Sequence, residues 1–280
     1  MMIKSLNLKA FMVSILLAAV MLLGWGLATQ PAGSASPKVS PEYAAMMGAN
    51  SANKSGLPTP AEFWHTVRDQ LSDPFYDHGP NDKGIGIQLG YSLARVLAGF
   101  LLAALLAIPL GFLLGMSPLM QRAFNPFIQL LKPISPLAWM PLALYTIKDA
   151  SASAIFVIFI CSLWPMLINT AYGVGSVRQE WLNVARTLEV SALRKVFLVV
   201  LPAAAPTILV GMRISMGIAW LVIVAAEMLV GGTGIGYFVW NEWNNLSLTN
   251  VIFAILMIGA VGMLLDMIFG RLSRLVTYND

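Results

Sequence analysis

The chain has 280 residues, of which 58% are hydrophobic and 11% charged, with a formal net charge of +4. Soluble domains carry about 45–50% apolar and ~25% charged residues, so this composition disfavours a soluble enzyme and a nucleic-acid-binding module despite a pI of about 9.3. The apolar residues form long runs that fit five or six helices of about 20 residues each, rather than the alternation of a β-barrel. We therefore predict an all-α polytopic membrane protein with about six transmembrane helices.

The first apolar stretch runs from about Leu8 to Leu27 and begins beside Lys4 and Lys9. These flanks also fit a secretory signal peptide, for which residues 32–35 offer a small-residue cleavage site. Because several further spans follow, we favour a retained transmembrane helix within residues 1–29.

Residues 30–84 form the one long polar segment of the chain, and we expect them to lie in the periplasm. The stretch from Pro60 to Trp64 has the composition of a helix start and predicts a short amphipathic surface helix. The segment closes with a turn-rich, acidic stretch at residues 73–82.

Residues 85–280 are predicted to form one membrane core. Five further apolar runs are expected to span the bilayer: Leu89–Met116, Phe124–Ile147, Ala152–Val174, Phe197–Val230 and Leu248–Phe269. A polar connector, residues 175–196, separates the fourth span of the chain from the fifth.

The distribution of Lys and Arg predicts the orientation, because the cytoplasmic ends of spans collect these residues. With the N-terminus inside, nine basic residues fall on the cytoplasmic side and five on the outer side. The nine are Lys4, Lys9, Arg122, Arg178, Arg186, Arg194, Lys195, Arg271 and Arg274. Both chain ends are therefore predicted to be cytoplasmic (N-in, C-in).

The connector carries the most specific motif of the chain. It reads Asn183-Val184-Ala185-Arg186-Thr187-Leu188-Glu189 and continues through an apolar stretch to Leu201-Pro202. This pattern resembles the EAA loop of the membrane subunits of ABC importers, in which E-A-A is followed by three residues, a glycine and an apolar stretch ending in I-x-L-P. Glu189 stands at the glycine position, where glycine would permit a tight turn that glutamate does not favour. The resemblance implies that these seven residues contact the ATPases.

The resemblance covers about Tyr91 to Val276, most of the chain. Further stretches look like the nitrate, sulfonate, taurine and bicarbonate branch of these permeases, among them Lys132–Leu142, Trp164–Thr170 and Ala219–Met228. Residues 133–245 are most similar to cyanobacterial nitrate/nitrite permease subunits, with bicarbonate and cyanate relatives close behind. The implied fold is that of a type I ABC importer permease.

The same resemblance implies partners and a location. Two permease subunits, expected to form a homodimer, would surround a central pathway in the plasma (inner) membrane of a bacterium, with a cyanobacterium favoured. ATP and Mg would be bound by cytoplasmic ATPase subunits, since this chain has no phosphate-binding Gly-x-x-x-x-Gly-Lys-Ser/Thr loop and is expected to need no cofactor itself. A periplasmic substrate-binding protein or lipoprotein would deliver a small inorganic anion. Nitrate or nitrite is favoured, with bicarbonate, cyanate or sulfonate as alternatives.

Ionisable residues inside the predicted spans are candidates to line the pathway, because burying them in a bilayer is costly. The candidate set, with one aromatic residue, is Arg95, Lys132, Arg213, Trp220 and Glu227. The last three recur every seven residues and share one helix face about 21 Å long. Arg213 either provides positive potential for an anion or forms an interhelical ion pair with Asp266, and the ion pair is favoured.

Prolines 133, 136 and 141 interrupt the predicted third span. The backbone groups that they leave unpaired are tolerated in a bilayer only where protein or water covers them. A discontinuous helix that lines a transport site and a simple packing kink both fit this pattern.

Two rival classes make different demands on the sequence. An intramembrane hydrolase would need a catalytic pair at membrane depth, and neither that pair nor two histidines at metal-binding spacing is visible, so we expect no catalytic or metal site. A secondary transporter stays as a distant alternative, and it would transport without any ATPase.

Overall fold

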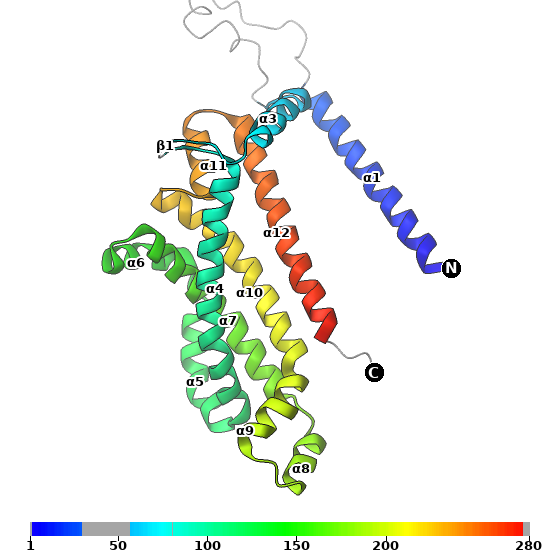
Figure 1. The fold of residues 1–280 in the computed structure, drawn as a ribbon, viewed down its shortest axis with the longest axis vertical. Coiled ribbons are helices and arrows are strands. Elements are labelled where there is room, and N and C mark those ends of the chain that lie inside the picture. Colours follow the sequence, from blue (N-terminus) through cyan, green and yellow to red (C-terminus); the bar gives the residue numbers. More distant parts are fainter. Residues whose placement is uncertain (1, 30–56, 80, 277–280) are drawn as a thin grey trace, which may run out of the picture. The chain divides into compact units, whose positions relative to one another are not determined.

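A computed structural model describes residues 2–29, 57–79 and 81–276. Within it the chain divides into two compact units, one of residues 1–73 with 242–255 and one of residues 74–241 with 256–280. The cleavage site considered at residues 32–35 lies outside the described residues. Figure 1 shows the elements along the chain.

The first unit contains α1 (Met2–Ala28) and α3 (Pro60–Ser72). The rings of Trp25 and Phe63 lie 5.5 Å apart, so an aromatic contact joins these two helices. Thr59 caps α3, because its hydroxyl accepts from the Glu62 backbone N–H while the Glu62 carboxylate accepts from the Thr59 N–H. The helix predicted to start at Pro60 is therefore confirmed.

The second unit opens with a short antiparallel hairpin of β1 (Asp77–Gly79) and β2 (Asp82–Lys83). The Lys83 ammonium lies 2.6 Å from the Asp77 carboxylate, and this bond lowers the pKa of Asp77. Helices then follow in the order α4 (Ile85–Met116), α5 (Pro118–Leu131), a 3₁₀ turn η1 (Pro136–Trp139), α6 (Met140–Ile147), α7 (Ala150–Gly175), α8 (Gln179–Thr187), α9 (Ala192–Lys195), a π-helical turn η2 (Val196–Val200), α10 (Leu201–Val230), α11 (Ile235–Asn244) and α12 (Leu248–Val276).

Helices α4 and α7 pack side by side in the second unit (Figure 1). Gly99 of α4 faces Ile158 of α7, and Gly111 faces Thr170, each too closely for a Cβ atom to fit. Small residues at such contacts let helix backbones approach in a membrane. Since residue numbers rise together along this contact, α4 and α7 run parallel.

Helix α10 completes the core and runs antiparallel to α7. Gly173 of α7 faces Thr207 of α10, while the Ser215 hydroxyl of α10 donates to the Ser162 carbonyl of α7 at 2.8 Å. Fully buried apolar side chains from all three helices fill the space between them: Val96, Ala103 and Ala107 of α4, Val157, Ile158 and Met166 of α7, and Ala219, Ile223 and Ala226 of α10.

The predicted third span is broken in the structure. In the part of the chain that the structure describes, five helices are long and apolar enough to cross a membrane, and the pair formed by residues 118–131 and 136–147 adds a sixth if it is one span bent by 85°. Because α4 and α7 run parallel, the chain must return across the membrane between them, so we count this pair as a span. The interruption predicted from the prolines lies at residues 132–135, since Pro133 and Pro136 cannot donate the helical N–H bonds, and the span is a discontinuous helix rather than a simple kink.

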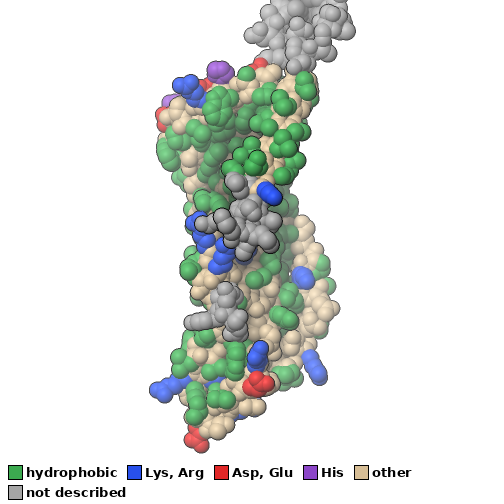
Figure 2. Space-filling view, turned by 90° about the vertical axis from the view of Figure 1, so that its right-hand side faces the viewer, with side chains coloured by type: hydrophobic (Ala, Val, Ile, Leu, Met, Phe, Trp, Pro, Cys, Tyr) green, Lys and Arg blue, Asp and Glu red, His purple; other side chains and the backbone are tan. Residues whose placement is uncertain are grey.

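The surface of the molecule is mostly apolar, as lipid contact requires. Figure 2 shows one face on which hydrophobic side chains predominate and charged side chains are few. Large side chains that are more than half exposed include Leu101, Leu105, Leu119, Phe127, Leu130, Leu221 and Leu229. This agrees with the prediction of an all-α polytopic membrane protein.

Candidate functional site

The connector folds into α8 and a tight turn. After the helix ends, the Val190 N–H donates to the Ala185 carbonyl at 3.1 Å and the Glu189 N–H to the Arg186 carbonyl at 3.0 Å. These two bonds define a Schellman motif, which places the residue after the cap in the left-handed region and usually has glycine there. Glu189 occupies that place with φ of 52°. The turn that glutamate disfavours is therefore present, at a conformational strain of roughly 1–2 kcal/mol.

The faces of α8 differ in exposure. Ala185 is buried at 4% exposure, whereas Val184 and Leu188 are 59% and 70% exposed. An open hollow of about 720 Å³ lies between α8 and the start of α10, and it is lined by Trp181, Val184, Ala185, Leu188, Val190, Leu198, Val199, Pro202, Ala203, Pro206 and Val276. One face of α8 is thus attached to the membrane core, while an apolar face remains available to a partner.

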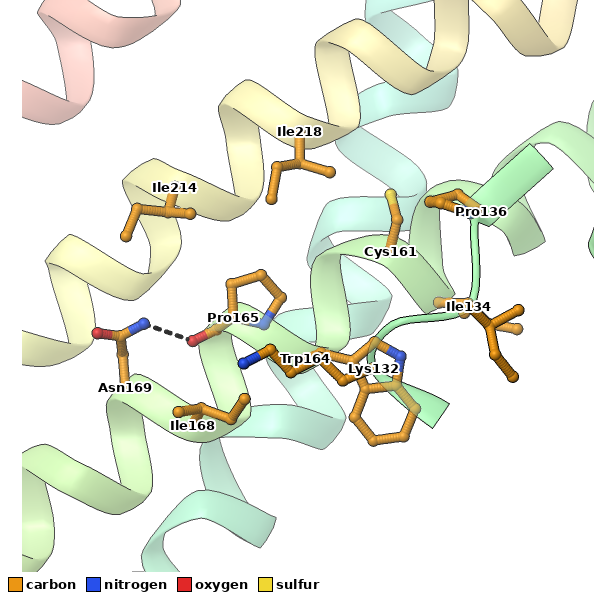
Figure 3. A pocket seen from close by; sticks show the side chains of 11 residues that line it. Lys132, Ile134, Pro136, Cys161, Trp164, Pro165, Ile168, Asn169, Ile214 and Ile218 are labelled. Carbon is orange, nitrogen blue, oxygen red and sulfur yellow. Dashed lines mark hydrogen bonds between the residues drawn. The ribbon is translucent and has the colours of Figure 1, made fainter. Parts of the chain in front are cut away.

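A second pocket lies at the break of the third span (Figure 3). Its volume is about 410 Å³, and its lining comes from the break, α7 and α10: Lys132, Ile134, Pro136, Ile160, Cys161, Trp164, Pro165, Ile168, Asn169, Ile214 and Ile218. The Asn169 amide donates to the Pro165 carbonyl at 2.8 Å. Among the described residues the Lys132 ammonium has no ion-pair or hydrogen-bond partner, and it is the one charged group in this lining.

A closed polar cluster lies around Glu227, which is 2% exposed. Its carboxylate accepts from the Ser92 hydroxyl at 2.8 and 2.9 Å, from the Arg95 guanidinium at 2.8 Å and from the Gly236 N–H at 3.0 Å. A Cβ atom on Gly234, whose φ is 155°, would collide with this carboxylate. A buried ion pair that is also hydrogen-bonded to its neighbours holds its surroundings together. The cluster therefore attaches the glycine-rich segment after α10 to α4.

Arg213 and Asp266 form the ion pair that was favoured from the sequence. The guanidinium contacts both carboxylate oxygens, at 2.6 and 2.5 Å, and so joins α10 to α12. About two helical turns further along α10, the Trp220 indole N–H donates to the Ile258 carbonyl of α12 at 3.0 Å. The seven-residue repeat on α10 thus contacts α12 at two of its members and α4 at the third.

Comparison with known proteins identifies the family. Residues 107–278 match the family described as the binding-protein-dependent transport system inner membrane component. The chain belongs to this family. It is 46% identical over 222 residues to a nitrate import permease of Synechocystis sp., covering 79% of this chain and 81% of the relative. It is 42% identical over 230 residues to the bicarbonate transport system permease CmpB of the same organism, covering 81% and 82%.

A solved structure supports the same fold. The permease matches the methionine ABC transporter MetNI, in inward-facing conformations, with a TM-score of 0.60 at 15% identity, over 68% of this chain and 94% of that chain. The protein is therefore a multi-pass inner-membrane permease of an ABC importer with the type I fold expected from the sequence.

The five candidate pathway residues lie in different surroundings in the structure. Arg95 and Glu227 are occupied with each other in the closed cluster, and Trp220 is bonded to α12. Lys132 and Arg213 each line a pocket.

Several residues of the closed cluster were not singled out from the sequence. Gln88 accepts from the Gly234 N–H at 2.6 Å, and Ser92 also accepts from the Ile235 N–H at 2.9 Å. Gln88, Ser92 and Arg95 follow one another at four and three residues along α4, which puts them on one helix face. That polar face within an apolar run was the signal available in the sequence.

Proposed function

We propose that this permease carries nitrate or nitrite into the cell. The observation that supports this proposal is the 46% identity to nitrate import permeases over about four-fifths of both chains. Bicarbonate is the second candidate, because the bicarbonate permeases are nearly as similar, at 42%. Both substrates are small planar oxyanions, so the permease itself needs to stabilise one negative charge.

The Lys132 pocket is the place where that charge would be stabilised. An ammonium without a counter-ion among the described residues, in a lining that contains isoleucine and tryptophan side chains, raises the local positive potential at membrane depth. Trp164 and Asn169 line the same pocket from α7 and would limit its width. In this proposal the broken helix lines the transport path, whereas the charge of Arg213 is neutralised by Asp266.

The conformational change that ATP drives in the ATPases is proposed to be transmitted to the membrane helices through α8. Two permease copies would each bind one cytoplasmic ATPase at Asn183, Val184, Ala185, Arg186, Thr187, Leu188 and Glu189. ATP and Mg would be held by those ATPases, and a periplasmic binding protein would deliver the anion. The exposed apolar face at Val184 and Leu188 supports this assignment, because such a face needs a partner in water.

Labelled-nitrate uptake tests the proposal directly. Proteoliposomes that contain the permease, its ATPases and the binding protein should accumulate nitrate only with ATP, and a tenfold excess of bicarbonate should compete weakly. Stronger competition by bicarbonate would favour the second candidate. Uptake without ATPases would instead identify a secondary transporter.

A charge placed on α8 tests the coupling role. Leu188→Glu should abolish most ATP-dependent uptake and reduce co-purification of the ATPase, because a carboxylate would be desolvated at the contact. Leu275→Glu, at another exposed leucine of a cytoplasmic helix end, is the matched control. If the α8 variant assembles and transports as well as this control, the coupling assignment is wrong.

A further inference from the structure

A third pocket, of about 430 Å³, opens between α10 and the last turns of α12. Its lining is Arg213, Asp266, Met267, Gly270, Arg271, Ser273 and Arg274. The α12 members recur at three and four residues, so they share the helix face that is turned towards Arg213. Three guanidinium groups therefore converge on one small, polar space.

The charges in this pocket do not balance. Asp266 is fully engaged with Arg213 through two short bonds. Among the described residues the guanidinium groups of Arg271 and Arg274 make no ion pair and no hydrogen bond. With three arginines and one aspartate in its lining, the pocket carries a net charge of +2.

The depth of the pocket suits a ligand at the membrane boundary. Arg274 and Arg271 lie two and five residues before the end of α12, which corresponds to about 3 and 8 Å along the helix axis, and Asp266 lies about 15 Å from that end. With the predicted orientation, this end faces the cytoplasm. The pocket thus extends from the inner membrane surface into the apolar layer.

The ion pair in this pocket is about half exposed on the surface of the chain. The side chains of Arg213 and Asp266 are 45% and 55% exposed. Charged groups at this depth are stable only beside water, protein or another polar group. A polar occupant of the pocket would meet this requirement and neutralise the two free arginines.

We propose that the pocket formed by Arg213, Arg271 and Arg274 binds an oxyanion at the cytoplasmic end of the permease. The guanidinium fork matches the paired oxygens of a phosphate or a similar anion, and Asp266 keeps Arg213 oriented towards the pocket. The oxyanion comes either from an anionic lipid headgroup of the inner leaflet or from a soluble inorganic anion. The site is separate from the Lys132 pocket and does not depend on which anion the importer carries.

The test compares two charge-matched double variants of the full-length permease. Arg271→Gln with Arg274→Gln removes the free guanidinium groups, whereas Arg122→Gln with Arg194→Gln removes two exposed cytoplasmic arginines outside the pocket. In the first arm, phosphatidylglycerol is titrated into delipidated permease and counted by native mass spectrometry. In the second, potassium phosphate or nitrate is titrated into permease in phosphatidylcholine nanodiscs while the melting temperature is followed.

A lipid source predicts one saturable phosphatidylglycerol per permease, bound about thirtyfold more weakly by the pocket variant and unchanged in the control. A soluble source predicts a saturable rise in melting temperature with phosphate or nitrate that the pocket variant loses and the control keeps. Equal behaviour of the two variants in both arms would overturn the proposal. Since neither arm measures uptake, failure here leaves the nitrate proposal standing, and failure of nitrate uptake leaves this site standing.

Discussion

Two membrane-embedded cations of this permease have opposite surroundings. Arg95 lies in the closed cluster, where Glu227, Ser151 and the Thr233 carbonyl all accept from its guanidinium. Lys132 lies at a helix break, in an open pocket, without a partner among the described residues. A cation that is paired and hydrogen-bonded within the protein stabilises the fold, whereas a cation without such partners can bind a ligand. Arg95 and Lys132 are both basic residues within predicted spans, but Arg95 has a structural role whereas Lys132 is placed to bind a ligand.

The largest expected effect comes from opening the closed cluster. Glu227→Ala leaves the Arg95 guanidinium buried without its counter-ion, which should destabilise the permease by about 3–5 kcal/mol. Thermal unfolding of the purified protein in detergent measures this loss. Glu180→Ala, on the exposed surface of α8, is the control and should change stability by less than about 0.5 kcal/mol. Equal melting temperatures for Glu227→Ala and Glu180→Ala would show that the cluster does not stabilise the fold.

A smaller effect is expected from crowding the same cluster. Gly234→Ala adds a Cβ atom that collides with the Glu227 carboxylate, in addition to the strain of a positive φ. Gly232 also has a positive φ, of 93°, but has no atom within 4 Å of the added Cβ. We expect about 2–3 kcal/mol of destabilisation at 234 and about 1 kcal/mol at 232. If both variants unfold at the same temperature, the close approach of Gly234 to the Glu227 carboxylate does not contribute to stability.

The smallest predicted effect is a gain in stability at the turn after α8. Glu189→Gly removes the strain of a left-handed glutamate and should stabilise the turn by about 1 kcal/mol, with uptake retained. Hydrogen exchange at the Val190 N–H should slow about fivefold as a result. Glu180→Gly, in the first turn of α8, should instead destabilise the helix, because glycine has a low helix propensity. Faster exchange in the Glu189 variant would show that the carboxylate itself stabilises the turn.

Much of the architecture could be predicted from the sequence, because it depends on local signals. Apolar runs predicted the membrane helices. The connector pattern singled out the segment that forms α8, but the tight turn after it was not expected from a glutamate at position 189. The helix start at Pro60 followed from a proline at the first position of an amphipathic stretch. The division into residues 1–29, 30–84 and 85–280 stays a prediction, since the compact units are divided differently along the chain.

The arrangement of charges could not be predicted with the same success, because it depends on contacts between distant parts of the chain. Arg95 and Glu227 are 132 residues apart in sequence, and nothing local indicates that they meet. The Arg213–Asp266 pair was predictable, since the two residues carry opposite charges and lie in consecutive predicted spans. The prolines near Lys132 indicated an interruption, but only the packing of α7 and α10 against the break created a pocket there.

Lys132, which has no partner among the described residues, is proposed to act on the anion rather than on the fold. Nitrate uptake at subsaturating concentration, measured side by side for Lys132→Met and Lys132→Arg, tests it most directly. We predict that the methionine variant loses about tenfold of its uptake rate while its melting temperature stays near that of the parent, and that the arginine variant keeps most of the uptake because the charge is retained. Equal uptake by the methionine and arginine variants would contradict the claim.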